Sequence, residues 1–243
     1  MDKAFVAKCD DYGSENVEKA VERIFDFFGG PEQILKKGKK VLLKTNLLLA
    51  RDPNGAATTH PEVVRAMASR LVSYGAEVMI ADSPGGPYTA ASLKHVYDVC
   101  GMTGAAERSG ASLNFDTSQH AKTFNAEDGV RVFELIDPVV KCDVIISCAK
   151  LKTHSLAYFT GAAKNMFGTI AGLNKAAYHA NYPKIEDFSA MIVDLVRTVD
   201  PDFSVIDGVY GMEGDGPSAG TPKYAGVLIG AANPFAADEA AMR

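Results

Sequence analysis

The sequence lacks the closely spaced cysteines from which zinc and iron–sulfur sites are built. Its 243 residues include Cys9, Cys100, Cys142 and Cys148, which are scattered along the chain with no CxxC pair. Because zinc knuckles and iron–sulfur clusters draw on clustered thiolates, no such site is expected within these residues. We expect the four thiols to be free and reduced, as in the cytosol.

The sequence also lacks a long apolar run and an excess of basic residues. No apolar segment approaches the roughly 20 residues that a transmembrane helix needs, and the first residues are charged rather than signal-like. The formal net charge of −5 argues against generic binding to nucleic acid or to an anionic membrane. We therefore expect a cytoplasmic protein, with neither nucleic acid nor a membrane as a partner, in which any cationic site is local.

Predicted strands and helices alternate along most of the chain. The expected strands are AFVAK (4–8), KKVLLKTN (39–46), EVMIADS (77–83), DVIISCA (143–149), FSVID (203–207) and YAGVLIG (224–230). The expected helices start near Ser14, Thr59, Thr89, Ile185 and Asn233, with Ser14 and Thr59 as the capping residues of the first two. This order predicts an α/β fold with a mostly parallel, Rossmann-like sheet and helices on both faces.

Residues 103–134 interrupt the alternation. We expect a short strand at Leu113–Phe115 and a hairpin formed by KTFN and VRVFEL, which would turn at Asp128-Gly129. A small β-hairpin insertion at 103–134 within a single α/β domain, 1–243, is the simplest interpretation.

Polar clusters follow four of the predicted strands. They are Lys44-Thr45-Asn46, Asp82-Ser83, Lys150 to His154, and Asp207-Gly208. Ligands of open parallel sheets bind beyond the carboxyl ends of the strands. If the strands are parallel, these clusters lie at one edge of the sheet and can form one site.

The stretch KLKTHSLAYFTGAAKNMFGTIAGLNK (150–175) concentrates lysines, a histidine and small residues. A single lysine at a strand end commonly extends into water, but Lys150, Lys152 and Lys164 together with His154 favour an anion site, to which Lys44 can add. The segment Thr160-Gly161-Ala162-Ala163 can begin a helix whose amides contribute, although it lacks Walker A spacing.

Two histidines are candidates for the same site. His154 is either a general acid/base or metal ligand, or a histidine that fixes its loop by hydrogen bonds. His179 lies between two tyrosines in YHANY and can line the pocket, but a surface loop histidine is favoured.

The acidic residues near strand ends allow a further interpretation. Asp82, Asp207, Glu213 and Asp215 can hold a divalent cation or balance the lysines. Turn formation is favoured for Glu213 and Asp215. The loop GDGPSAG does not predict a dinucleotide site, because Pro217 and a predicted strand follow it where a helix should begin.

Several motifs together resemble the domain-of-unknown-function family 362. They are KTN, THPEVVRAM, AKLKTHSLAYFTGAAKNMFGTI, VIDGVYGMEGDGPSAGTP and NPFAADEAA, and they span almost the whole chain in matching order. Members of this family often carry a ferredoxin-like segment that binds two 4Fe-4S clusters. The resemblance and the abrupt end of the helical pattern at Arg243 imply a further C-terminal ferredoxin-like segment outside this chain, and any such clusters are expected only there.

Three functions fit these observations. The first is a redox-linked enzyme domain that binds a small carboxylated or phosphorylated anion and works with a ferredoxin-type module. The second is a non-catalytic electron-transfer or docking domain, and the third is a divalent-metal-dependent hydrolase or transferase using Asp82, Asp207 and His154. The sequence leaves open whether the chain is an enzyme.

Under the first hypothesis, the sequence assigns a set of residues to the site, with no metal ligands among them. The catalytic candidates are His154, Lys152 and Lys164. The ligand-binding candidates are Lys44, Asn46, Lys150, Thr153, Thr160, Asn165, Asp207, Gly214 and Gly216.

Overall fold

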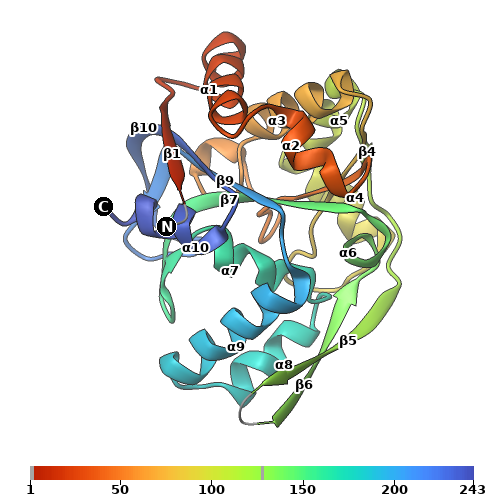
Figure 1. Ribbon diagram of the computed structural model, residues 1–243. Coiled ribbons are helices and arrows are strands. Elements are labelled where there is room, and N and C mark those ends of the chain that lie inside the picture. Colours follow the sequence, from red (N-terminus) through yellow and green to blue (C-terminus); the bar gives the residue numbers. More distant parts are fainter. Residues whose placement is uncertain (1–2, 127–128) are drawn as a thin grey trace.

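The fold is built on one eight-stranded sheet. The computed structural model describes residues 3–126 and 129–243, and the sheet order is β1-β10-β9-β7-β2-β3-β4, with β8 paired to β7 (Figure 1). The strands are β1 (Ala4–Lys8), β2 (Lys40–Lys44), β3 (Glu77–Ala81), β4 (Ser112–Leu113), β7 (Val144–His154), β8 (Tyr158–Thr160), β9 (Phe203–Glu213) and β10 (Thr221–Ala231).

The sheet is mostly parallel, as the sequence predicts. β9, β7, β2, β3 and β4 pair in parallel, whereas β10 pairs antiparallel with both β9 and β1. β10 reverses direction because only a short loop joins it to β9, and antiparallel strands alone can be connected so tightly. The expected α/β class is confirmed.

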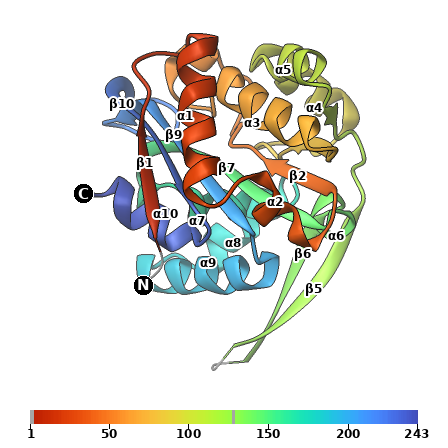
Figure 2. The same ribbon diagram turned by 45° about the horizontal axis from the view of Figure 1, so that its top comes forward.

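Helices cover both faces of the sheet. α1 (Ser14–Phe27), α3 (Pro61–Ser73), α4 (Ala90–Val99) and α5 (Met102–Ser109) lie on one side, and α7 (Ala162–Asn165), α8 (Asn174–Asn181) and α9 (Ile185–Val199) lie on the other (Figures 1 and 2). The remaining helices are α2 (Pro31–Ile34), α6 (Pro138–Lys141), α10 (Pro234–Ala241), and the 3-10 turns η1 (Leu35–Lys37), η2 (Pro53–Gly55) and η3 (Met166–Thr169).

Each face has its own apolar core. One core buries Val17, Val21 and Ile24 of α1 among residues of α3 and the sheet, and the other buries Phe188 and Leu195 of α9. These side chains recur at helical spacing, so burying them stabilises the helices they belong to. Within the described residues, no helix has the length and apolar character needed to cross a bilayer.

Helix starts differ in detail from the expected ones. Ser14 is the first residue of α1 rather than its cap, and its hydroxyl donates to the Glu62 carboxylate at 3.1 Å. α3 is capped by His60, not Thr59: the imidazole Nδ1 of His60 accepts from the Glu62 amide. The Thr59 hydroxyl instead donates to the Cys148 carbonyl at 2.7 Å, which ties this helix start to β7.

The insertion contains both helix and hairpin. α5 was not anticipated from the sequence, whereas β5 (Gln119–Ala126) and β6 (Gly129–Ile136) form the expected hairpin as a separate two-stranded sheet. The hairpin extends as an arm beyond the main body (Figure 2). The turn predicted at Asp128-Gly129 falls partly outside the described residues, because Asp128 is not among them.

The strand ends that carry polar clusters meet at one edge. The sheet has four consecutive parallel strands, β9, β7, β2 and β3. Lys44 of β2 is level with Ala81 of β3 and Ser147 of β7, so the residues that follow these three positions lie at the same edge of the sheet. β7 and β9 are longer than expected: β7 runs to His154, where β8 pairs with its last residues, and β9 runs to Glu213, so Asp207 and Gly208 lie within β9 and not after it. The lysine-rich segment therefore begins in a strand rather than a loop.

A buried ion pair joins β7 to β9. Lys150 Nζ lies 2.9 Å from Asp207 Oδ2, and both side chains are fully buried. The Lys150 ammonium also donates to the Tyr12 hydroxyl, and Asp207 accepts from Tyr12 and from the His60 amide. The pair thus connects two strands, the segment before α1 and the start of α3.

Removing the Asp207 carboxylate should destabilise the fold severely. Asp207→Ala leaves the Lys150 ammonium buried without its anion, which is expected to cost about 3–5 kcal/mol of unfolding free energy. Urea unfolding followed by circular dichroism measures this loss. Lys94→Ala, which breaks an exposed helical pair with Asp98, is the control and should leave the midpoint almost unchanged. A stable Asp207→Ala variant would show that the pair is not a structural requirement.

Candidate functional site

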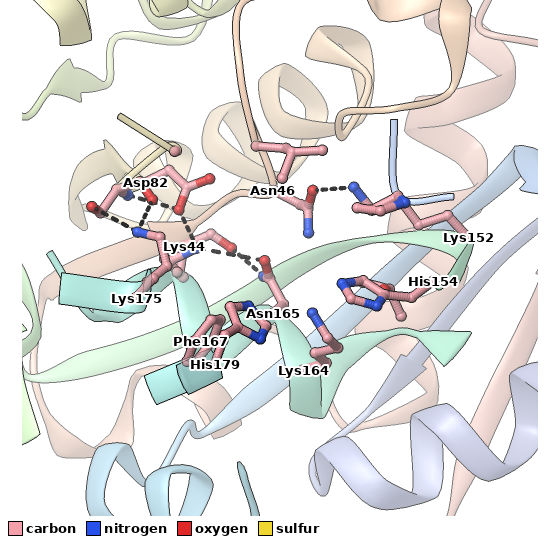
Figure 3. A pocket seen from close by; sticks show the side chains of 16 residues that line it. Lys44, Asn46, Asp82, Lys152, His154, Lys164, Asn165, Phe167, Lys175 and His179 are labelled. Atoms are coloured by element: carbon pink, nitrogen blue, oxygen red, sulfur yellow. Dashed lines mark hydrogen bonds and ion pairs between the residues drawn. The ribbon is translucent and has the colours of Figure 1, made fainter. Parts of the chain in front are cut away.

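A cavity of about 260 Å³ opens at the carboxyl edge of the sheet. Four lysines and two histidines contribute to its lining (Figure 3). They are Lys44 from β2, Lys152 and His154 from β7, Lys164 from α7, and Lys175 and His179 from α8. Segments from across the chain therefore converge on one strongly cationic pocket.

Lys44 is the one cavity lysine with a carboxylate partner among the described residues. Its Nζ lies 2.5 Å from Asp82 Oδ1, and both side chains are buried. Asp82 also accepts from the Leu47 and Ser83 amides, at 2.6 and 2.7 Å. Gly168 packs directly on this pair, since a Cβ there would lie 2.5 Å from both the ammonium and the carboxylate. The pair forms a neutral, closely packed part of the wall.

Lys152 and Lys175 are held by neutral oxygens. Lys152 Nζ donates to Asn46 Oδ1 at 2.9 Å and to the Ala57 carbonyl at 2.7 Å. Lys175 Nζ donates to the carbonyls of Ser83 and Ile170, at 2.7 and 2.8 Å. Burial, reinforced by the neighbouring Lys164 ammonium, lowers the pKa of Lys152 to about 7, and burial lowers the pKa of Lys175 to about 8.

Lys164 lies against aromatic rings. Its Nζ is 5.7 Å from the centroid of Phe167 and 5.9 Å from that of Phe188. Burial lowers the pKa of the Lys164 amine to about 8. The amine form of this lysine is therefore more accessible at neutral pH than that of an exposed lysine.

His154 presents a fixed tautomer to the cavity. Its Nδ1 accepts from the Leu156 and Ala157 amides, at 3.1 and 3.2 Å, so the ring proton resides on Nε2. Burial and the Lys164 ammonium lower the pKa of His154 to about 3. At neutral pH the ring is a neutral hydrogen-bond donor through Nε2.

His179 lies in the cavity wall and not in a surface loop. It belongs to α8, and its ring stacks on Phe188 with centroids 4.9 Å apart. Burial and the Lys164 ammonium lower the pKa of His179. The signal available in the sequence was the four-residue spacing of Lys175 and His179, which places both on one face of a helix.

The structure brings together seven of the residues expected at the site. Lys44, Asn46, Lys152, His154, Thr160, Lys164 and Asn165 all line the cavity. Asn165 is committed to internal contacts, since its Nδ2 donates to the Lys44 carbonyl and the Ser147 hydroxyl. Thr160 is buried, and within residues 3–126 and 129–243 its hydroxyl finds no hydrogen-bond partner. That hydroxyl remains available to a ligand.

The other five expected residues lie elsewhere. Lys150 and Asp207 form the buried pair on the α1 and α3 side of the sheet. Thr153 donates to the Gly214 carbonyl, and the Ser155 amide donates to the Gly216 carbonyl, so both glycines dock the β9–β10 loop onto β7. A bulge between β7 and β9 separates the surroundings of Lys150 from those of Lys152.

The amides at the start of α7 are already occupied. Asp238 of α10 accepts from the Ala162 and Ala163 amides, at 2.5 and 3.1 Å. Burial raises the pKa of the Asp238 carboxyl to about 6. The expected contribution of these amides to the anion site is therefore replaced by an internal cap.

The described residues hold no group of three or more histidine, cysteine, aspartate or glutamate side chains placed to bind a metal ion. Asp82 and His154 line the cavity, but Asp207 does not. The three residues considered for a divalent cation are thus not assembled in one place.

The tautomer of His154 can be observed directly. We expect nitrogen-detected NMR at pH 5 to 8 to show His154 neutral, with the proton on Nε2, because its pKa lies near 3 and its Nδ1 accepts two amides. His154→Gln identifies the resonance. A ring that gains a second proton between pH 5 and 7 would contradict this assignment.

This chain resembles known proteins both in sequence and in fold. The thylakoid-associated protein sll1697 of Synechocystis sp. is 29% identical over 229 residues, which cover 93% of this chain and 69% of the relative. The solved structure of the lactate racemase apoprotein from Thermoanaerobacterium thermosaccharolyticum superposes with a TM-score of 0.57 at 13% identity. The alignment covers 96% of this chain and 55% of the racemase chain, so the chain spans about half of that protein. At this identity the likeness shows a shared fold alone.

The sequence motifs identified above are matched over most of the chain. The family model described as Domain of unknown function (DUF362) matches residues 41–243, which include every residue lining the cavity. The chain therefore belongs to this family.

Proposed function

We propose that the chain is an enzyme domain whose cavity binds a small carboxylated or phosphorylated anion. The observation that supports this most directly is the cluster of Lys152, Lys164 and Lys175 around one cavity. Within the described residues, none of the three has a carboxylate partner. A bound anion would supply the missing negative charge.

The electrostatics of the lysines support the same proposal. Burial disfavours the ammonium form, which is why the pKa values of Lys152 and Lys164 fall to about 7 and about 8. An anion in the cavity would reverse part of this shift, because an opposite charge nearby stabilises the ammonium. Binding an anion would thus recover part of the free energy that it costs to bury these unpaired ammonium groups.

The shape of the site favours a small ligand over an acidic protein surface. Lys152 is only 3% exposed, and Lys175 is partly buried. Charges that dock a partner protein act from an exposed surface, where salt screens them strongly. The concave, shielded arrangement supports a metabolite-sized anion, and the docking function receives no comparable support.

The side chains suggest distinct roles. Lys152 and Lys175 would hold the anion, and the Nε2–H of His154 would donate to one of its oxygens. Lys164 would be the reactive group, since its amino group lies against aromatic rings and is not held by an oxygen acceptor among the described residues. Asn46 accepts from Lys152 through Oδ1, which leaves its Nδ2 to orient the ligand. A redox link to a ferredoxin-type module rests on the family resemblance alone.

Anion binding can be tested with oxalate and inorganic phosphate. Calorimetry should detect a complex, and Lys152→Met or Lys175→Met should weaken it about 10- to 100-fold, because a hydrogen bond to a charged group contributes about 1.5–3 kcal/mol. Lys36→Met, at an exposed position outside the cavity, is the matched control. If the three variants and the wild type bound these anions with equal affinity, the cavity would not be the binding site.

The affinity should also depend on pH. The ammonium forms are complete below the lowered pKa values, so oxalate should bind best below about pH 7 and lose affinity as the pH rises through about 8. Lys152→Arg, which stays charged, should show a smaller decline over the same range. Dissociation constants measured between pH 6 and 9.5 test this, and a flat wild-type profile would show that these lysines do not control binding.

A further inference from the structure

The four cavity lysines differ in how their amino groups are satisfied. Lys44, Lys152 and Lys175 each donate to two or more oxygens within hydrogen-bond distance. In the part of the chain that the structure describes, Lys164 has no such acceptor, and its amino group lies over the rings of Phe167 and Phe188. Lys164 is therefore the cavity lysine whose amino group is least restrained by hydrogen bonds.

An amine in such surroundings is a good nucleophile. Its lone pair becomes available once the proton is lost, and desolvation beside other cations favours that loss. Oxygen acceptors orient the N–H groups of the other three lysines, so that their nitrogen lone pairs are less free to turn toward a ligand. Aromatic faces attract a cation only modestly and cannot accept a full hydrogen bond.

The neighbours of Lys164 supply what addition to a carbonyl requires. Lys152 and Lys175 line the same cavity and can hold a carboxylate. His154 lines that cavity, and its Nε2–H can polarise a carbonyl oxygen (Figure 3). Phe167 lines the cavity beside the amine and reduces its contact with water.

We propose that Lys164 forms a reversible imine with the carbonyl carbon of a small oxo acid held in the cavity. The amine nitrogen adds to the carbonyl carbon, and the carbonyl oxygen takes up protons and leaves as water as the C=N bond forms. Overall, an ammonium and a carbonyl give a protonated imine and one water, so atoms and charge balance. The inference rests on the proposed anion site and narrows its ligand to an oxo acid.

Reductive trapping tests the imine. Wild-type protein incubated with pyruvate and sodium cyanoborohydride should acquire one carboxyethyl group per chain, with saturation in pyruvate, and peptide mass spectrometry should locate it on Lys164. Lys164→Arg should lose this adduct, whereas Lys36→Arg, outside the cavity, should keep it. Excess oxalate should slow the labelling by competing for the same cavity.

The outcomes separate this inference from the proposed function. If Lys164→Arg still binds oxalate within a few-fold of wild type, loss of labelling reflects loss of the amine and not of folding or anion binding. Labelling that spreads over exposed lysines, or persists in Lys164→Arg, would overturn the imine while leaving anion binding intact. Failure of wild-type protein to bind oxalate or phosphate would instead overturn the proposed anion site.

Discussion

Two buried lysine–aspartate pairs hold the carboxyl ends of the central parallel strands together. Lys44 of β2 pairs with Asp82 just after β3, and Lys150 of β7 pairs with Asp207 of β9. The pairs lie on opposite sides of the sheet, one in the cavity wall and one against the segment before α1 and the start of α3. Because an unpaired charge is costly in such surroundings, each pair fixes the alignment of adjacent strand ends.

This arrangement determines which charges the cavity presents. Lys44 is neutralised locally and Lys150 is withdrawn to the opposite side, so the cationic character of the pocket comes from Lys152, Lys164 and Lys175. The amides at the start of α7 are capped by Asp238 and add nothing to it. In the proposed anion site, recognition would thus depend on side chains whose charge varies near neutral pH, rather than on a helix terminus whose partial charge is fixed.

The sequence was sufficient to predict the α/β class, the parallel central strands and the edge at which their polar ends meet. It could not show that Lys150 and Lys152 have different surroundings. The two lysines are two residues apart in β7, a spacing that normally places side chains on the same face of a strand, and the bulge between β7 and β9 gives them different neighbours. The pairing of Asp238 with amides 75 and 76 residues away is equally invisible to local patterns. The four-residue spacing of Lys175 and His179 could have placed both on one helix face, but no strong apolar stripe in the sequence marked α8 as a helix.

The cavity wall is sensitive to substitution at Gly168. The backbone of η3 packs so closely on the Lys44–Asp82 pair that a single added carbon would force the ammonium, the carboxylate or the backbone to shift. The Gly168 carbonyl also accepts from the Ser83 amide, which limits how far the backbone can retreat. A change from glycine to alanine, although it adds no charge, would therefore alter the electrostatics of the cavity, because it would disturb the contact between the Lys44 ammonium and the Asp82 carboxylate, and both side chains line the cavity.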